Sequence, residues 1–230
     1  MDMNGMRYEI KLRWTACHAD EVRRWLRLHP MGFVEAYPPR RVNSIYFDSV
    51  ESNNFMDNVA GVGRRRKLRF RWYGPSYTEV QGRLELKHKS NQLGWKEVCP
   101  IQHTFDLTAL PSWEPFATQL GAYATPPFTL ALAQFPQIAL YVYYRREYYE
   151  SGDRRLRVTL DTDVHFYEQW LAPQPNFNRA AWLEPSPMII EVKAEAKDYR
   201  RVAELLSAFP LAVDKSSKYV EGLAWTIGLL

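Results

Sequence analysis

The chain has 230 residues, of which 46% are hydrophobic and 24% charged, an ordinary composition for a globular protein with one substantial core or two small ones. Its two cysteines, Cys17 and Cys99, form no CxxC pair, which argues against a disulfide framework and predicts a reducing compartment. The thirty Lys and Arg residues give a net charge of only +4, but they are clustered, which favours an anionic partner.

The ends and apolar segments of the chain indicate no membrane segment. The start, Met1 to Tyr8, lacks the apolar region of a signal peptide. The longest apolar stretch, Phe128 to Tyr144, is interrupted by Gln134, Pro136 and Gln137. We therefore expect a cytoplasmic protein.

Alternation of charged with apolar residues is the main structural pattern, and such period-two alternation predicts strands. Alternation predicts strands at residues 7–14, 65–72, 83–89, 155–161 and 190–195. A high content of β-branched and aromatic residues predicts two more, at residues 42–48 and 140–149. Amphipathic spacing predicts helices at residues 20–28, 197–208 and 217–229, and proline-rich connections are expected at 111–115 and 173–187. This pattern predicts one α+β domain over residues 1–230, mainly antiparallel β with a few helices.

Five of these strands carry one face that is almost purely Arg, Lys and Glu. A single charged strand face is usually exposed to solvent. Five such faces are harder to explain in this way, because like charges opposite each other across strands repel and need a counter-charge, which a bound polyanion would supply. If the sheet closes into a barrel of about eight strands, these side chains line its interior. Arg and Lys there suit condensed phosphates, and the interspersed Glu suit Mg²⁺ or Mn²⁺. We therefore predict a closed, cationic barrel with flanking helices.

Several motifs, in order along nearly the whole chain, resemble the VTC-domain polyphosphate polymerases of the triphosphate tunnel (CYTH-like) superfamily. The opening Arg7–Lys11 is similar to an R-x-E-x-K start, and Val42–Asp48 to a V-x-S-x-YFD strand. Lys67–Gly74 is similar to an R-x-R-WYG strand. The series continues with Leu84–Lys89 and Trp95–Lys96, Tyr144–Arg146, Leu156–Asp161, Ile190–Lys193 and Asp214–Tyr219.

The resemblance implies a role for each matched residue. Arginines that hold phosphates, together with a basic lysine, would act in catalysis: Arg69, Arg71, Arg146, Arg157 and Lys193. Basic and hydroxyl side chains would bind substrate: Lys11, Lys67, Lys87, Lys96, Lys215, Ser217 and Lys218. Glu191 would hold the metal, with Glu9 as a second ligand, whereas Glu85 is a further ligand or an ion-pair partner. The implied cofactor is Mn²⁺ or Mg²⁺.

The implied activity is transfer of the ATP γ-phosphate to a growing polyphosphate chain inside a cationic tunnel. A hydrolase of inorganic or organic triphosphate and a non-catalytic polyphosphate-binding module are the alternatives. Nucleic acid could bind Arg64–Arg66 with stacking on Phe70, Trp72 and Tyr73, but the carboxylates interspersed on several strands disfavour it. The sequence does not identify any protein partner.

Overall fold

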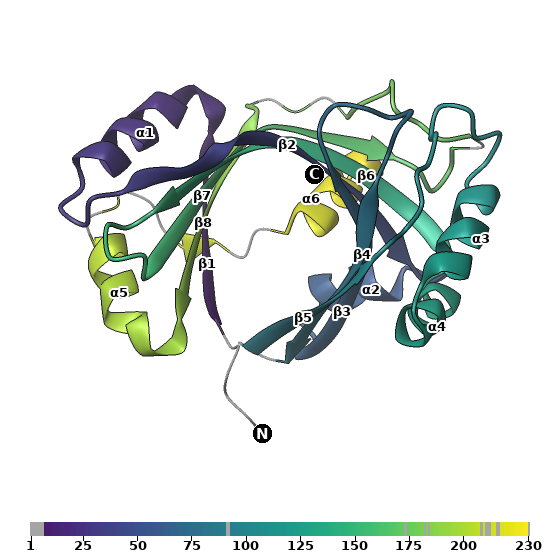
Figure 1. The fold of residues 1–230 in the computed structure, drawn as a ribbon, viewed down its shortest axis with the longest axis horizontal. Helices are drawn as coiled ribbons and strands as arrows, with labels where there is room; N and C mark the ends of the chain where they lie inside the picture. The colour runs from purple at the N-terminus through teal and green to yellow at the C-terminus, as the bar shows by residue number, and fades with distance from the viewer. Residues whose placement is uncertain are drawn as a thin grey trace. The chain divides into compact units, whose positions relative to one another are not determined.

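The computed structural model describes residues 7–90, 93–172, 174–181, 183, 185–207, 209, 213–214 and 217–229. Strands dominate it, and the ladders that it describes are antiparallel. The strand order is β5-β4-β3-β2-β6-β7-β8-β1-β9 (Figure 1). The strands are β1 (Arg7–Thr15), β2 (Val34–Asp48), β3 (Arg64–Tyr73), β4 (Gly82–Ser90), β5 (Leu93–Pro100), β6 (Gln137–Glu150), β7 (Leu156–Glu168), β8 (Pro187–Glu195) and β9 (Val213–Asp214). The predicted α+β class with a mainly antiparallel sheet is confirmed.

The predicted closed barrel is not found. Among the described residues the strand order ends at β5 and at the two-residue strand β9, and no ladder joins these ends. Alternation within a strand reports its two faces, whereas closure depends on twist, tilt and the register of every ladder. The sequence pattern therefore predicted most of the strands correctly, missed β5 and β9, and predicted the closure wrongly.

Helices connect and cover the strands. The helices are α1 (Ala19–Leu28), α2 (Asn53–Val59), α3 (Glu114–Tyr123), α4 (Pro126–Gln134), α5 (Tyr199–Ser207) and α6 (Lys218–Thr226). The three predicted helices correspond to α1, α5 and α6, but α2, α3 and α4 were not predicted. Proline lies at the first turn of α3 and α4, where its missing N–H costs nothing. Proline in this segment thus marks helix starts as well as connections. No described helix is long and apolar enough to cross a membrane.

The chain forms two compact units, each assembled from three separate segments. Unit 1 comprises residues 1–40, 144–164 and 183–216, and unit 2 comprises residues 41–143, 165–182 and 217–230. Strands β2, β6 and β7 contribute residues to both units. The prediction of one domain over residues 1–230 stays a prediction.

In unit 1 the apolar faces of β1, β7 and β8 pack against α1 and α5. Leu12, Val158 and Val192 from the strands share a buried core with Leu26 of α1 and Leu205 of α5. Figure 1 shows both helices on the same side of these strands. Because neighbouring strand residues point to opposite faces, the charged residues that alternate with this core lie on the other side of the sheet.

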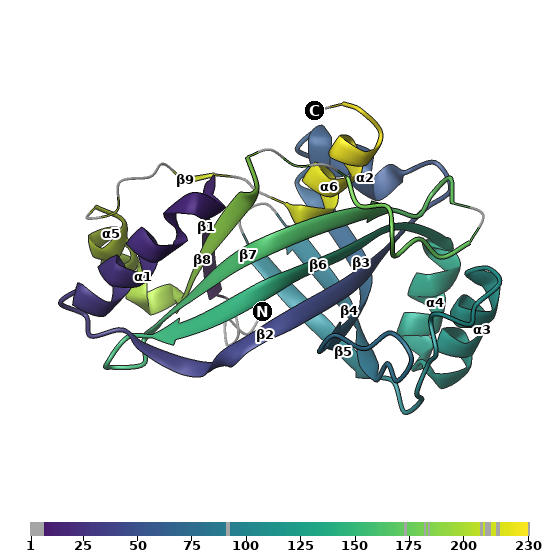
Figure 2. The ribbon, with the colours of Figure 1, turned by 90° about the horizontal axis from the view of Figure 1, so that it is seen from above.

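In unit 2 the apolar face of β3 packs against α3 and α4. Leu68, Phe70 and Trp72 are buried, and the Phe70 ring meets Phe116 of α3 edge to face, with centroids 5.4 Å apart. Phe128 of α4 belongs to the same core. The opposite face of β3 carries Lys67, Arg69 and Arg71, and α2 and α6 lie beside each other in this unit (Figure 2).

Candidate functional site

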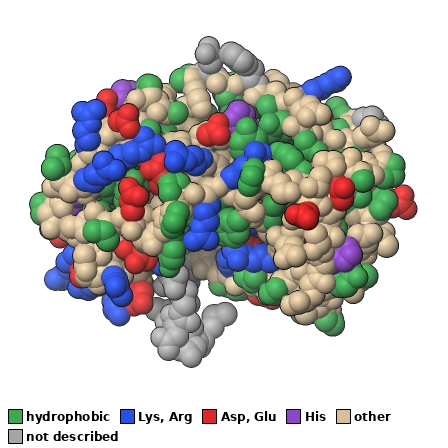
Figure 3. Space-filling model, turned by 45° about the horizontal axis from the view of Figure 1, so that its top comes forward, with side chains coloured by type: hydrophobic (Ala, Val, Ile, Leu, Met, Phe, Trp, Pro, Cys, Tyr) green, Lys and Arg blue, Asp and Glu red, His purple; other side chains and the backbone are tan. Residues whose placement is uncertain are grey.

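The structure places the predicted site residues in two groups, one in each unit. Figure 3 shows Lys and Arg side chains interspersed with Asp and Glu on the surface turned towards the viewer. The unit 2 group is Lys67, Arg69, Arg71, Lys87, Lys96, Ser217 and Lys218. The unit 1 group is Glu9, Lys11, Arg146, Arg157, Glu191 and Lys193. Lys215 lies outside the described residues.

Lysines occupy one register position across three neighbouring strands of unit 2. Lys67 of β3 is opposite Lys87 of β4, which is opposite Lys96 of β5. Two residues along these strands Arg69 is opposite Glu85, and four residues along Arg71 is opposite Arg83, so this face carries far more positive than negative charge. Like charges placed opposite each other are destabilising. This face therefore requires compensating negative charge.

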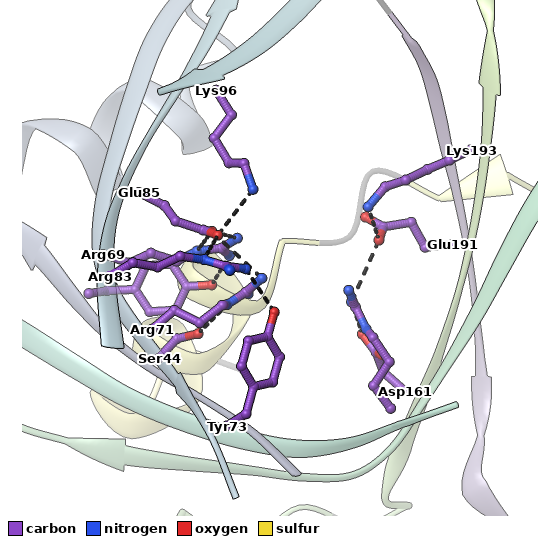
Figure 4. Close-up of polar contacts among 12 residues, drawn as sticks. Ser44, Arg69, Arg71, Tyr73, Arg83, Glu85, Lys96, Asp161, Glu191 and Lys193 are labelled. Atoms are coloured by element: carbon purple, nitrogen blue, oxygen red, sulfur yellow. Dashed lines mark hydrogen bonds and ion pairs between the residues drawn. The ribbon is translucent and has the colours of Figure 1, made fainter. Parts of the chain in front are cut away.

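Glu85 is the carboxylate at the centre of this basic face (Figure 4). Its carboxylate lies 2.5 Å from Arg69 Nη2, 3.6 Å from Arg71 Nη1, 3.0 Å from Arg83 Nε and 3.0 Å from Lys96 Nζ. Only 1% of Glu85 is exposed. Burial alone would raise the pKa of Glu85, but the charges of Arg69, Arg71 and Lys96 outweigh it and hold that pKa well below its usual range. One charged carboxylate thus orients four basic side chains.

Strand β2 supplies hydroxyl groups to the same arginines. Ser44 is opposite Arg71 in the ladder and accepts a hydrogen bond from Arg71 Nε at 3.3 Å. Tyr46 is opposite Arg69, and its Oη accepts from Arg69 Nη1 at 3.2 Å. Burial would raise the pKa of Tyr46, but the charges of Arg69 and Arg71 lower it instead. From α6, Ser217 Oγ accepts a hydrogen bond of 2.7 Å from Lys67 Nζ.

In unit 1 the charged faces of β1, β6, β7 and β8 form a second network. Arg146 of β6 donates two hydrogen bonds to Asp161 of β7, at 2.6 and 2.7 Å. Its Nη2 lies 3.5 Å from Glu191 Oε2, which is 2.8 Å from Lys193 Nζ (Figure 4). Burial would lower the pKa of Arg146, but the negative charge of Asp161 outweighs it and raises that pKa. Asp161 thus holds the guanidinium beside Glu191.

Glu191 remains charged despite its burial. Only 6% of Glu191 is exposed. Burial would raise its pKa, but the charges of Lys193, Arg146 and Lys11 hold it well below the usual range, and its side chain contacts that of Glu9. Glu9 also lies 3.7 Å from Lys11. The sequence-predicted metal ligands Glu9 and Glu191 are therefore brought together.

Arg157 of β7 lies at the exposed end of this network. It is opposite Lys193 of β8 in the ladder. Its Nη2 and Nε lie 2.6 and 3.1 Å from one oxygen of Glu150. Its side chain is 43% exposed, so this ion pair contributes little to stability and leaves the guanidinium accessible to a ligand.

The carboxylates of unit 1 suit a cation that shares its coordination with phosphate. The described residues contain no cluster of three or more His, Cys, Asp or Glu able to hold a metal ion. They do bring Glu9 and Glu191 into contact, and Thr159 Oγ1, opposite Glu191, is buried without a hydrogen-bond partner in the described part of the chain. Mg²⁺ is commonly held by one or two carboxylates, with water and phosphate oxygens as further ligands. The residues present fit such a cation.

Several residues of the two networks were not predicted in these roles. They are Arg83, Glu150 and Asp161, which hold other site residues, and Ser44 and Tyr46, which contact arginines. Arg83, Glu150 and Asp161 each lie at the same alternation parity as a predicted residue of their own strand, whereas no site residue was predicted on β2, which carries Ser44 and Tyr46. The partner of each residue depends on ladder register, which the sequence pattern leaves open.

The family model of the VTC domain matches residues 6–227. The chain belongs to the VTC domain family. The predicted membership in the VTC family is thus confirmed. No curated protein matches the sequence.

Solved structures similar to this VTC domain are distant in sequence. One is a Vibrio parahaemolyticus protein described as a "putative adenylate cyclase", with 12% identity over 96% of this chain and 99% of that one, and a TM-score of 0.52. Another is a protein of Pyrococcus horikoshii OT3, with 14% identity over 93% and 97% of the chains and a TM-score of 0.49. At such identity the first likeness shows the fold alone.

Proposed function

We propose that this VTC domain is a metal-dependent polyphosphate polymerase, which transfers the γ-phosphoryl group of ATP to a growing polyphosphate chain and releases ADP. Family membership supports an enzyme that acts on triphosphates. The observation that carries the proposal is the lysine row Lys67–Lys87–Lys96 beside the arginines around Glu85. A row of cations on one strand face offers several contacts to the repeated negative charges of a condensed phosphate.

The basic side chains would bind and orient the reacting phosphates. Arg69 and Arg71 offer planar N–H pairs that fit two phosphate oxygens at once, and the lysines add point charges. Because Glu85 already fixes the guanidinium of Arg69, little rotamer freedom remains to be lost on binding. Alignment of donor and acceptor phosphates and stabilisation of the transferring charge are the main tasks in phosphoryl transfer.

The acceptor and the metal complete the proposed chemistry. A terminal phosphate is ionised at neutral pH, so its oxygen needs no general base. Glu191 and Glu9 would hold Mn²⁺ or Mg²⁺. When bound, this cation would neutralise charge on the phosphate oxygens. Arg146, held by Asp161, and Lys193 would keep the Glu191 carboxylate ionised and oriented.

Product analysis tests the polymerase proposal. Purified protein is incubated with ATP and Mn²⁺, with and without a short polyphosphate primer, and the products are followed by polyphosphate gel and ADP assay. We expect polyphosphate and ADP to form in step. Arg71→Ala should lower the rate by about tenfold or more, since it removes a charge-assisted contact worth about 1.5–3 kcal/mol.

Arg27→Ala is the matched control. Arg27 pairs with Glu35 on the surface at 3.4 Å, and both side chains are more than half exposed. Its loss should leave turnover unchanged. Release of orthophosphate alone, even with primer, would replace the polymerase by a triphosphate hydrolase. No turnover of ATP or triphosphate at all would leave a binding module.

A further inference from the structure

Asp48, at the end of β2, has a buried carboxylate with four hydrogen-bond donors. Oδ1 accepts from the backbone N–H of Ser49 at 2.7 Å and of Asn54 at 2.8 Å. Oδ2 accepts from the N–H of Phe55 at 3.0 Å and from Tyr219 Oη. Asp48 has 0% exposure. The amides of Asn54 and Phe55 tie it to α2, and the fourth bond reaches α6, 171 positions along the chain.

Tyr219 connects this carboxylate to the arginine network. It lies in the first turn of α6 and is buried, with 1% exposure. Its ring stacks on Tyr46, with centroids 5.3 Å apart and an interplanar angle of 26°. Tyr46 Oη in turn accepts from Arg69. Because residues 46 and 48 lie on one face of β2, a single strand face both holds α6 and contacts Arg69.

The two residues before Tyr219 face the same basic strands. Ser217 caps α6, and its Oγ also accepts the 2.7 Å hydrogen bond from Lys67 Nζ. Lys218 lies close enough to Tyr46 for its charge to lower the pKa of that hydroxyl, after the larger effects of burial and the two arginines. The start of α6 is thus seated beside the face that carries Lys67 and Arg69.

We propose that Asp48 and Tyr219 are positioning residues, whose hydrogen bond seats the start of α6 so that Ser217 and Lys218 join Lys67 in binding condensed phosphate. The inference rests on the proposed function, because it requires that the basic face of β3 binds such a ligand. The hydroxyl of Tyr219 serves here as a fixed donor, and its burial and the Asp48 charge raise its pKa. Neither residue needs to touch the substrate.

Tyr219→Phe is the test, because it keeps the ring and removes only the donor. Binding of inorganic tripolyphosphate is measured by calorimetry at a temperature where circular dichroism shows the variant folded. We expect binding about tenfold weaker than in the wild type, which corresponds to ~1.4 kcal/mol. Hydrogen exchange should become faster in residues 217–226 of the variant.

Tyr149→Phe in unit 1 controls for general loss of stability. Tyr149 is 1% exposed, and its Oη donates to the Glu147 carboxylate at 2.8 Å, a bond of the same kind between two residues of unit 1. We expect tripolyphosphate binding by Tyr149→Phe to equal that of the wild type. If tripolyphosphate binding is weakened equally in both variants, the Asp48–Tyr219 hydrogen bond contributes only to general stability, and the inference is overturned.

A double-mutant cycle with Lys218→Ala identifies the route of the effect. If Tyr219 acts through Lys218, Tyr219→Phe should change tripolyphosphate affinity much less in the Lys218→Ala background than in the wild type. Full additivity would contradict the inference. If the wild type binds tripolyphosphate and Tyr219→Phe binds it equally well, the inference fails but the proposed function stands. If the wild type does not bind tripolyphosphate, both the proposed function and the inference fail.

Discussion

Glu85 illustrates how single residues organise the basic face. The buried Glu85 carboxylate is stabilised only while Arg69, Arg71, Arg83 and Lys96 are present. In return, its negative charge offsets the repulsion among these four cations. The four cations still carry more positive charge than Glu85 can neutralise, so a bound polyanion would neutralise the remainder. Glu85 is therefore an internal counter-charge for the site, and no metal is needed to explain its position.

Glu85→Gln should destabilise the protein and make it more dependent on ligand. Removal of one partner from a buried ion pair costs about 3–5 kcal/mol of unfolding free energy. Urea unfolding measures this loss, and tripolyphosphate should restore more stability to the variant than it adds to the wild type. Glu97→Gln is the control, since Glu97 pairs with His88 at 2.8 Å but is 46% exposed, and about 1 kcal/mol or less is expected. Equal losses in both variants would contradict this role for Glu85.

Helix α6 is the element on which the unit 2 group depends, because Ser217 and Lys218 lie at its start. Its approach to β6 and β7 is made possible by Gly222. A Cβ atom added there would lie 2.6 Å from Phe166 Cδ1 and 2.7 Å from Leu140 Cδ2. Only a residue without a side chain lets the helix lie this close to the sheet.

Gly222→Ala should therefore displace α6. Overpacking in a buried position costs about 1–3 kcal/mol, against a gain of about 1 kcal/mol in helix propensity. We expect a lower melting temperature and weaker tripolyphosphate binding. Gly121→Ala in α3, where an added Cβ meets nothing within 4 Å, should raise stability instead. A Gly222→Ala variant as stable as Gly121→Ala would argue against close packing of α6.

At the level of elements, alternation predicted the strands that carry the site. Residues 65–72 and 190–195 fall within β3 and β8. Strand β5 was missed because its sequence, LGWKEVCP, alternates weakly and contains Gly and Pro. For that reason the strand that carries Lys96 was not predicted, although Lys96 itself was identified from the family resemblance.

At the scale of the whole molecule, motifs far apart in sequence meet because the chain enters each unit three times. The order of the motifs allowed the family to be predicted, and the VTC match over residues 6–227 confirms it. Which charges meet could not be predicted. The contacts of Glu85 with Lys96 and of Asp48 with Tyr219 depend on ladder register and helix packing, and neither leaves a local pattern.

Binding of a condensed phosphate is the step on which every role assigned above depends, and calorimetric titration with orthophosphate, pyrophosphate and tripolyphosphate measures it directly. Because successive cations should engage successive phosphates, at about 1.5–3 kcal/mol per contact, affinity should rise by about tenfold or more with each added phosphate. It should fall as salt is raised. Equal affinities for the three anions, or no saturable binding of tripolyphosphate, would contradict the account.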